Sequence, residues 1–238
     1  MRRLLLAIGF LTRLPVPSIR ADASDFAGAV RCYPLVGLII GALVAGAGWL
    51  GGAADPWIGA LAALIAWVAV TGALHLDGLA DLADGIGAAH GDRNRLLAVM
   101  ADPHVGSFGV VAIVLQLLAK IVLLHDVVAG GWLAVVLVPF AARMGPLVWA
   151  RWLRPLRPSG LGAQIASAVR ARDLLGWGAV WAAACAAVPA LLLAPLLVVA
   201  VGGWLRHRLG GVTGDAHGAG IELVETGLLV ALVAIGQG

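Results

Sequence analysis

The chain has 238 residues, of which 61% are hydrophobic and only 12% are charged. Its mean hydropathy is +0.99, whereas an ordinary soluble domain carries roughly 25% charged residues. A water-soluble, disordered or fibrous chain of this size is excluded, because too little polar surface is present to cover so many apolar side chains. The composition therefore predicts an integral membrane protein, in a single polytopic domain covering residues 1–238.

The basic residues follow the pattern of a membrane protein. Sixteen basic residues stand against thirteen acidic ones, and all except Lys120 are Arg. They flank the apolar stretches instead of forming one patch, so a cytoplasmic bias of Arg explains them better than nucleic-acid binding does. We therefore expect no nucleic-acid partner and a location in a bacterial-type cytoplasmic (inner) membrane.

The first 33 residues are expected at the cytoplasmic interface. The apolar run at 4–11 is shorter than the roughly 20 residues that a spanning helix needs. No small-residue cleavage site follows it, so we expect no cleaved signal peptide. Five later stretches are candidates for membrane spans: 34–50, 57–74, 105–124, 132–150 and 221–235.

One further apolar stretch, 174–204, is long for one span and short for two. A hairpin that turns near Pro189 returns Arg206 and Arg208 to the side of the other Arg-rich segments. We therefore expect the hairpin, and with it an all-α bundle of about six to seven transmembrane helices with a cytoplasmic N-terminus. The remaining cytoplasmic loops are then expected at 75–104, 151–173 and 205–220.

Three aspartates share one face of a predicted helix at the end of the second span. Asp77, Asp81 and Asp84 are spaced i, i+4, i+7, which places them within an arc of about 60°. No Lys or Arg lies between residues 71 and 90 to neutralise them, so their mutual repulsion favours a bound cation. The alternative is a helix end solvated by headgroup water. Oxygen ligands without cysteine favour Mg²⁺, or else Mn²⁺, over zinc.

A glycine-rich segment before the last span carries the second acidic set. Asp215, Glu222 and Glu225 fall within an arc of about 80° if the segment is helical. Taken alone, the segment is equally well explained as a loop followed by a helix start, where acidic residues are favoured by the helix dipole. With 174–204 as a hairpin, both acidic sets face the cytoplasm. Two acidic helices can then hold metal ions around a phosphate group.

The segment between the two acidic sets supplies candidates for substrate contacts. Arg93 and Arg95 can bind a diphosphate or serve only as topology determinants. Gly106 can admit a ligand or only allow close helix packing. No serine-hydrolase, P-loop or zinc-protease motif competes with phosphoryl chemistry in this sequence.

Five segments resemble the cobalamin synthase family, the adenosylcobinamide-GDP ribazoletransferases. In chain order they are FLTRLPVP (Phe10–Pro17), YPLVGLIIG (Tyr33–Gly41), HLDGLADLADG (His75–Gly85), DPHVGSFG (Asp102–Gly109) and GGVTGDAHGAGIELVE (Gly210–Glu225). The resemblance implies a Mg²⁺-dependent membrane enzyme that closes the nucleotide loop of cobalamin. A ribose hydroxyl of α-ribazole, or of its 5′-phosphate, would attack the phosphate next to cobinamide in adenosylcobinamide-GDP and release GMP.

The same resemblance implies roles for individual residues. The catalytic set would be Asp77, Asp81, Asp84, Asp215, Glu222 and Glu225. The metal ligands would be Asp77, Asp81, Asp84 and Asp215. Apart from the resemblance, the candidate substrate-binding residues of this sequence are His75, Arg93, Arg95, Asp102, Gly106 and Thr213. The implied partners are the two substrates and membrane lipid, together with other cobalamin-assembly enzymes or a second copy of the chain.

Three other functions use acidic membrane helices. A CDP-alcohol phosphotransferase would carry an Ala-Arg pair after Asp77-Gly78, and this chain lacks that pair. An intramembrane prenyltransferase would carry Asn beside its acidic residues, and none accompanies them here. A cation transporter would place its acidic residues near the middle of the membrane, whereas these are expected at the ends of spans.

Overall fold

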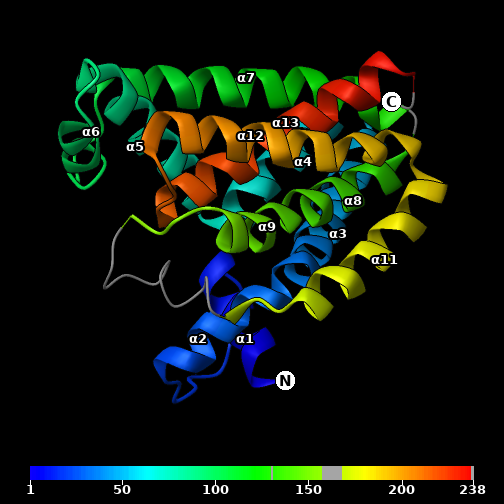
Figure 1. Ribbon diagram of the computed structural model, residues 1–238. Coiled ribbons are helices and arrows are strands. Elements are labelled where there is room, and N and C mark those ends of the chain that lie inside the picture. Colours follow the sequence, from blue (N-terminus) through cyan, green and yellow to red (C-terminus); the bar gives the residue numbers. More distant parts are fainter. Residues whose placement is uncertain (130, 157–167, 237–238) are drawn as a thin grey trace.

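The computed structural model describes residues 1–129, 131–156 and 168–236, and this part of the chain is helical apart from connections and one isolated bridge, Pro155 with Val212 (Figure 1). The helices are α1 (Arg2–Leu11), α2 (Ala23–Ala29), η1 (Val30–Cys32), α3 (Tyr33–Gly52), α4 (Pro56–Thr71), α5 (Leu74–Ala89), α6 (Arg93–Val99), α7 (Ser107–Ala129), α8 (Trp132–Ala142), α9 (Met144–Trp152), α11 (Ala171–Ala187), η2 (Pro189–Leu193), α12 (Ala194–Leu209) and α13 (Gly214–Ala234).

Membrane-spanning candidates confirm a polytopic helical bundle. Within the described ranges, five segments are long and apolar enough to cross a membrane: Ala23–Gly52, Ser107–Val128, Trp132–Trp152, Pro189–Leu209 and Gly214–Ala234. A sixth crossing results if α4 and α5 count as one broken span. The count is thus five to six, where the sequence predicted six to seven. The difference arises because α4 ends in a sharp bend and because α11, with 17 residues, is too short to count as a span.

The stretch 174–204 forms two helices, as the hairpin prediction required. The first ends at Ala187, and Val188 leaves helical geometry with φ of −134° and ψ of 87°. The short helix η2 then leads into α12, and Trp181 Nε1 donates across the turn to the Leu191 carbonyl oxygen at 3.0 Å. Figure 1 shows α11 and α12 meeting at this turn. The predicted loop 151–173 is described only outside residues 157–167.

The bend between α4 and α5 sets the position of the acidic helix. Gly72 and Ala73 both have left-handed backbone angles, with φ of 60° and 58°, a conformation that costs free energy at an alanine. Arg13 supports the bend, because its N–H donates to the Val70 carbonyl oxygen at 2.7 Å and its side chain covers Gly72. The chain turns by 84° here. Much of the predicted loop 75–104 is helical after this bend, in α5 and α6.

Helix α13 lies in the middle of the bundle and packs against α5, α7, α8, α9 and α12 (Figure 1). It begins at Gly214, seven residues before the predicted start at 221, because the glycine-rich segment is itself helical. Thr213 caps it, since its hydroxyl oxygen accepts from the Ala216 N–H at 3.1 Å. The second acidic set therefore lies on one continuous helix, with Glu225 near its middle and not at a span end.

Candidate active site

The two acidic helices, α5 and α13, cross where glycines let their backbones touch. A Cβ on Gly78 would lie 2.5 Å from the carbonyl oxygen of Asp215, and one on Gly218 would lie 3.3 Å from Cα of His75. No side chain fits between the two helices at this crossing. The first turns of both helices, which carry Asp77 and Asp215, are therefore held together.

A cavity of about 280 Å³ opens beside this crossing. It brings together Asp77 and Asp215, one from each predicted acidic set, and its remaining wall is largely apolar. The N-terminal segment and the start of α3 close one side, and none of their residues was among the predicted site residues. The lining residues are Phe10, Leu11, Val30, Tyr33, Leu74, His75, Asp77, Pro146, Gly214, Asp215, His217, Gly218 and Ile221.

Two histidines in the cavity wall are almost fully buried. His75 is 3% exposed and His217 is 9% exposed. Arg143 NH2 donates to His75 Nδ1 at 3.4 Å, and the His217 ring stacks on Trp149 with centroids 5.9 Å apart. Nε2 of His75 and Nδ1 of His217 have no hydrogen-bond partner among the residues that the structure describes. His217 was not among the predicted site residues, although it stands within the glycine-rich motif.

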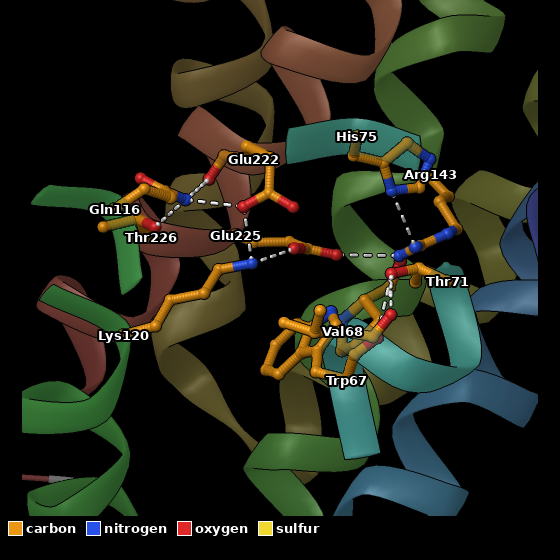
Figure 2. Close-up of polar contacts among 11 residues, drawn as sticks. Trp67, Val68, Thr71, His75, Gln116, Lys120, Arg143, Glu222, Glu225 and Thr226 are labelled. Carbon is orange, nitrogen blue, oxygen red and sulfur yellow. Dashed lines mark hydrogen bonds and ion pairs between the residues drawn. The ribbon is translucent and has the colours of Figure 1, made fainter. Parts of the chain in front are cut away.

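Glu222 and Glu225 are neutralised by buried cations and do not line the cavity. Lys120 Nζ lies 2.7 Å from Oε2 of each glutamate, and Arg143 NH1 lies 2.8 Å from Glu225 Oε1 (Figure 2). Gln116 Nε2 also donates to Glu222 Oε2 at 2.7 Å. The four charges sum to zero, and each charged side chain is at most 5% exposed. Equal numbers of positive and negative charges are needed here, because a buried charge without a partner would destabilise the fold.

This buried charge cluster, made up of Lys120, Arg143, Glu222 and Glu225, connects to the cavity through His75. Arg143 links the two, because it contacts both Glu225 and His75. Neither Lys120 nor Arg143 was among the predicted site residues. A signal was available, since an ionisable residue inside an apolar stretch is by default a candidate for a functional site.

Asp84 faces away from the cavity and binds the start of α7. Its carboxylate accepts from the Gly106 N–H at 2.7 Å and from the Gly109 N–H at 2.9 Å. A Cβ on Gly106 would lie 2.5 Å from Asp84 Oδ1, and Gly109 leaves as little room. Both glycines thus allow a carboxylate to approach the positive end of a helix. Gly106 contacts Asp84, and it is absent from the cavity wall.

The four predicted metal ligands do not converge as one group. Asp77 lines the cavity, Asp84 binds α7, and Asp81 is half-buried one turn after Asp77 on α5. In the described part of the chain, no group of three or more His, Cys, Asp or Glu side chains is arranged to hold a metal ion. The protein carboxylates at the cavity itself are Asp77 and Asp215.

Arg93 lies in a second cavity, of about 410 Å³, which is lined by three arginines. Its guanidinium covers Gly210 at the end of α12, and Arg154 and Arg206 complete the basic lining. Arg95 is exposed near the start of α6 and is not part of this lining. We refer to this cavity, with Arg93, Arg154 and Arg206, as the arginine cavity.

The last two predicted substrate-binding residues have local hydrogen-bonding roles. Thr213 is the cap of α13 described above. Asp102 accepts from the backbone N–H of His104 at 3.0 Å and contacts the His104 ring nitrogen Nδ1 at 2.6 Å. These hydrogen bonds lower the pKa of the Asp102 carboxyl. Both residues of this turn are exposed and lie outside the two cavities.

Comparison with known proteins identifies the family of the chain. The family model of cobalamin-5-phosphate synthase matches residues 3–233. An adenosylcobinamide-GDP ribazoletransferase of Novosphingobium aromaticivorans is 61% identical, over 99% of this chain and 98% of that protein. One of Laribacter hongkongensis is 51% identical, over 98% and 97%, and one of Thiobacillus denitrificans is 49% identical, over 97% and 94%. No solved structure matches. The chain belongs to the cobalamin-5-phosphate synthase family of adenosylcobinamide-GDP ribazoletransferases, the enzymes of nucleotide-loop assembly in cobalamin synthesis.

Proposed function

We propose that the cavity beside the α5–α13 crossing is the reaction site, where a ribose hydroxyl of α-ribazole attacks adenosylcobinamide-GDP. The observation that carries this is the presence of Asp77 and Asp215 in one cavity wall, although they are far apart in the chain. The hydroxyl oxygen forms a bond to the phosphorus next to cobinamide. The bond between that phosphorus and the bridging oxygen breaks, and GMP leaves with this oxygen.

The donor set fits Mg²⁺ better than a metal that needs a complete protein cage. Mg²⁺ in phosphate-handling sites is usually held by one or two carboxylates together with substrate phosphates and water. Asp77 and Asp215 would supply two carboxylates of this kind, and Asp81 lies one turn away. When bound, the ion would neutralise phosphate oxygens and stabilise the charge on the leaving group.

The residues of the chain have separate tasks in this proposal. Asp77 and Asp215 would hold the ion that binds the diphosphate, and one of the two carboxylates accepts the proton of the attacking hydroxyl. The glycine crossing fixes their separation. Glu222 and Glu225 instead hold Lys120 and thereby support the packing of α7 on α13. Asp84 fixes the start of α7.

The arginine cavity is proposed to hold the guanosine-side phosphate of the diphosphate. Three guanidinium groups can bind phosphate oxygens through charge-assisted hydrogen bonds. The arginine cavity and the reaction site are lined by neighbouring parts of the chain. Gly210 lines the arginine cavity, and Asp215, five residues later, lines the reaction site. The Val212 N–H also donates to the Arg154 carbonyl oxygen at 2.9 Å, which fixes this connection.

We further propose that this end of the bundle faces the cytoplasm of a bacterial-type inner membrane. Arg93, Arg154 and Arg206 gather there, as expected for a cytoplasmic face. Figure 1 places the end of α12, the start of α13 and α6 at the same end of the bundle. The α5–α13 crossing lies next to them, within reach of soluble nucleotides.

Release of GMP by the purified protein in liposomes tests the proposal. The assay contains adenosylcobinamide-GDP and α-ribazole, with and without Mg²⁺. In parallel reactions, a CDP-alcohol or a prenyl diphosphate takes the place of these two substrates. We expect release only with Mg²⁺ and both cobalamin precursors. Asp77→Asn and Asp215→Asn should each lower kcat by about 100-fold or more.

The matched control is Asp126→Asn, because Asp126 is an exposed acid near the other end of α7. It should release GMP at the wild-type rate. If folded Asp77→Asn and Asp215→Asn proteins keep the wild-type kcat, the reaction takes place elsewhere and the proposal fails.

A further inference from the structure

A cavity of about 510 Å³ lies where the N-terminal helices meet the start of α11, and it shares no lining residue with the two cavities above. Three arginines line it from separate segments: Arg3 in α1, Arg31 in η1, and Arg170 immediately before α11. Figure 1 shows α1, α2 and the start of α11 gathered at one end of the molecule. None of the described lining residues carries a carboxylate, so this interface cavity favours an anionic ligand.

Two of the three arginines are held at the wall of the interface cavity by contacts with other segments. Arg31 Nε donates to the Ala168 carbonyl oxygen at 2.7 Å and lies 3.2 Å from Asp173 Oδ2. The Arg3 side chain packs on Gly28, where a Cβ would lie 2.7 Å from Arg3 Nε. Among the described ion pairs, Asp173 offsets one of the three guanidinium charges. Two positive charges are therefore available to a ligand.

An open apolar surface begins beside the interface cavity. The candidate span Ala23–Gly52 includes Arg31, and α11 starts directly after Arg170. Within the first three turns of α11, Leu175 is 75% exposed and Val180 is 44% exposed. A Cβ on Gly176 would meet nothing within 4 Å. A soluble anion would use only the arginines, whereas an amphipathic anion would use both the arginines and the apolar surface.

We propose that the interface cavity binds one anionic phospholipid, with the lipid phosphate on Arg3, Arg31 and Arg170 and the acyl chains along α11. Guanidinium groups bind phosphate oxygens through charge-assisted hydrogen bonds. Basic cavities between membrane helices on the cytoplasmic side suit anionic headgroups, and the sequence predicts this side for both the N-terminal segment and the loop before α11. Phosphatidylcholine carries the same phosphate together with an ammonium group, which the two uncompensated arginines repel. The net charge of the headgroup therefore decides which lipid binds.

Native mass spectrometry of the purified protein in a nonionic detergent tests this inference. The protein is titrated with dioleoylphosphatidylglycerol or with dioleoylphosphatidylcholine, and the dissociation constant of the first bound lipid is measured. The two lipids have the same acyl chains and the same phosphate, and they differ in the group beyond it. We expect wild-type protein to bind phosphatidylglycerol on the order of tenfold more tightly.

Arg3→Gln and Arg170→Gln should each weaken the binding of phosphatidylglycerol about fivefold and leave that of phosphatidylcholine unchanged. Both side chains are exposed, so little packing is lost. The matched control is Arg208→Gln, which removes the same charge from an exposed position in the last turn of α12, and it should keep the full preference. Equal affinity of the wild type for both lipids, or an equal loss in Arg208→Gln, would overturn the inference. The wild-type comparison needs no variant to fold.

Competition distinguishes a lipid from a soluble phosphate as the ligand. Inorganic phosphate and α-ribazole 5′-phosphate, each at millimolar concentration, should leave phosphatidylglycerol bound, because neither has acyl chains to place along α11. Displacement of the lipid by either compound would assign the interface cavity to a soluble phosphate and overturn the inference. The inference does not rest on the proposed function, and none of these measurements depends on GMP release.

Discussion

Replacing Lys120 by methionine should unbalance the buried charge cluster. Lys120 Nζ lies 2.7 Å from both Glu222 and Glu225. Its removal leaves two carboxylates facing the single guanidinium of Arg143, so one negative charge is uncompensated in a buried environment. Methionine has nearly the same length and is apolar, so the change removes charge with little change in packing.

The magnitude follows from the burial of the cluster. Breaking a buried ion pair by removing one partner costs about 3–5 kcal/mol. The Lys120→Met/Glu222→Gln double variant removes one charge of each sign and should recover most of this loss. About 1 kcal/mol should remain lost, because Lys120 Nζ also lies 4.3 Å from the centroid of the Trp67 ring.

Thermal unfolding in detergent compares the wild type with the single and the double variant. For a chain of this size each kcal/mol corresponds to about 2–4 °C in Tm, so the single variant should fall by roughly 6–20 °C. The double variant should lie within about 4 °C of wild type by the same conversion. If Lys120→Met melts within a degree of wild type, or if the double variant is no more stable than the single one, the charge-balance reasoning is wrong.

Three more expected outcomes rest on individual contacts. Gly78→Ala should push α13 away and lower both Tm and GMP release, because its Cβ would lie 2.5 Å from the Asp215 carbonyl oxygen. The control is Gly46→Ala, whose Cβ meets nothing, and it should leave both unchanged or raise Tm slightly. Equal effects of the two substitutions would disprove the close crossing. Asp84→Ala should speed hydrogen exchange at the start of α7, since two N–H donors lose their acceptor; unchanged exchange there would rule out the capping role. Arg206→Gln should raise the KM for adenosylcobinamide-GDP about tenfold and leave the affinity for α-ribazole unchanged, whereas the reverse pattern would exclude the arginine cavity as the phosphate site.

The sequence predicted the architecture well where charge and hydropathy determine it. The composition identified a polytopic helical membrane protein, and the requirement to keep Arg206 and Arg208 on the basic side identified two helices in 174–204. It did not predict the bend at Gly72, because the apolar stretch 57–74 continues through the bend. It also placed the start of α13 too late, because a glycine-rich segment shows little helical propensity by itself.

The first acidic motif was identified correctly as helical, whereas the second was left open between a helix and a loop. The predicted convergence of their carboxylates was too simple. An arc of about 60° between Asp77 and Asp84 ignores their separation of about 10 Å along the helix axis. Because of this separation, Asp77 lies at the cavity whereas Asp84 binds the start of α7. No local pattern could pair Lys120 with Glu225, since 105 residues separate them. Only packing of α7 on α13 brings them together.

Binding of Mn²⁺ in the presence of adenosylcobinamide-GDP most directly tests the central claim, that the carboxylates at the cavity hold the metal and those elsewhere hold the fold. Electron paramagnetic resonance gives the concentration of free Mn²⁺, and hence the dissociation constant, for wild type, Asp77→Asn and Asp84→Asn. We predict that Asp77→Asn weakens binding tenfold or more, by loss of one of about two protein ligands, whereas Asp84→Asn binds like wild type. Wild-type affinity in Asp77→Asn, or an equal loss in Asp84→Asn, would contradict the account.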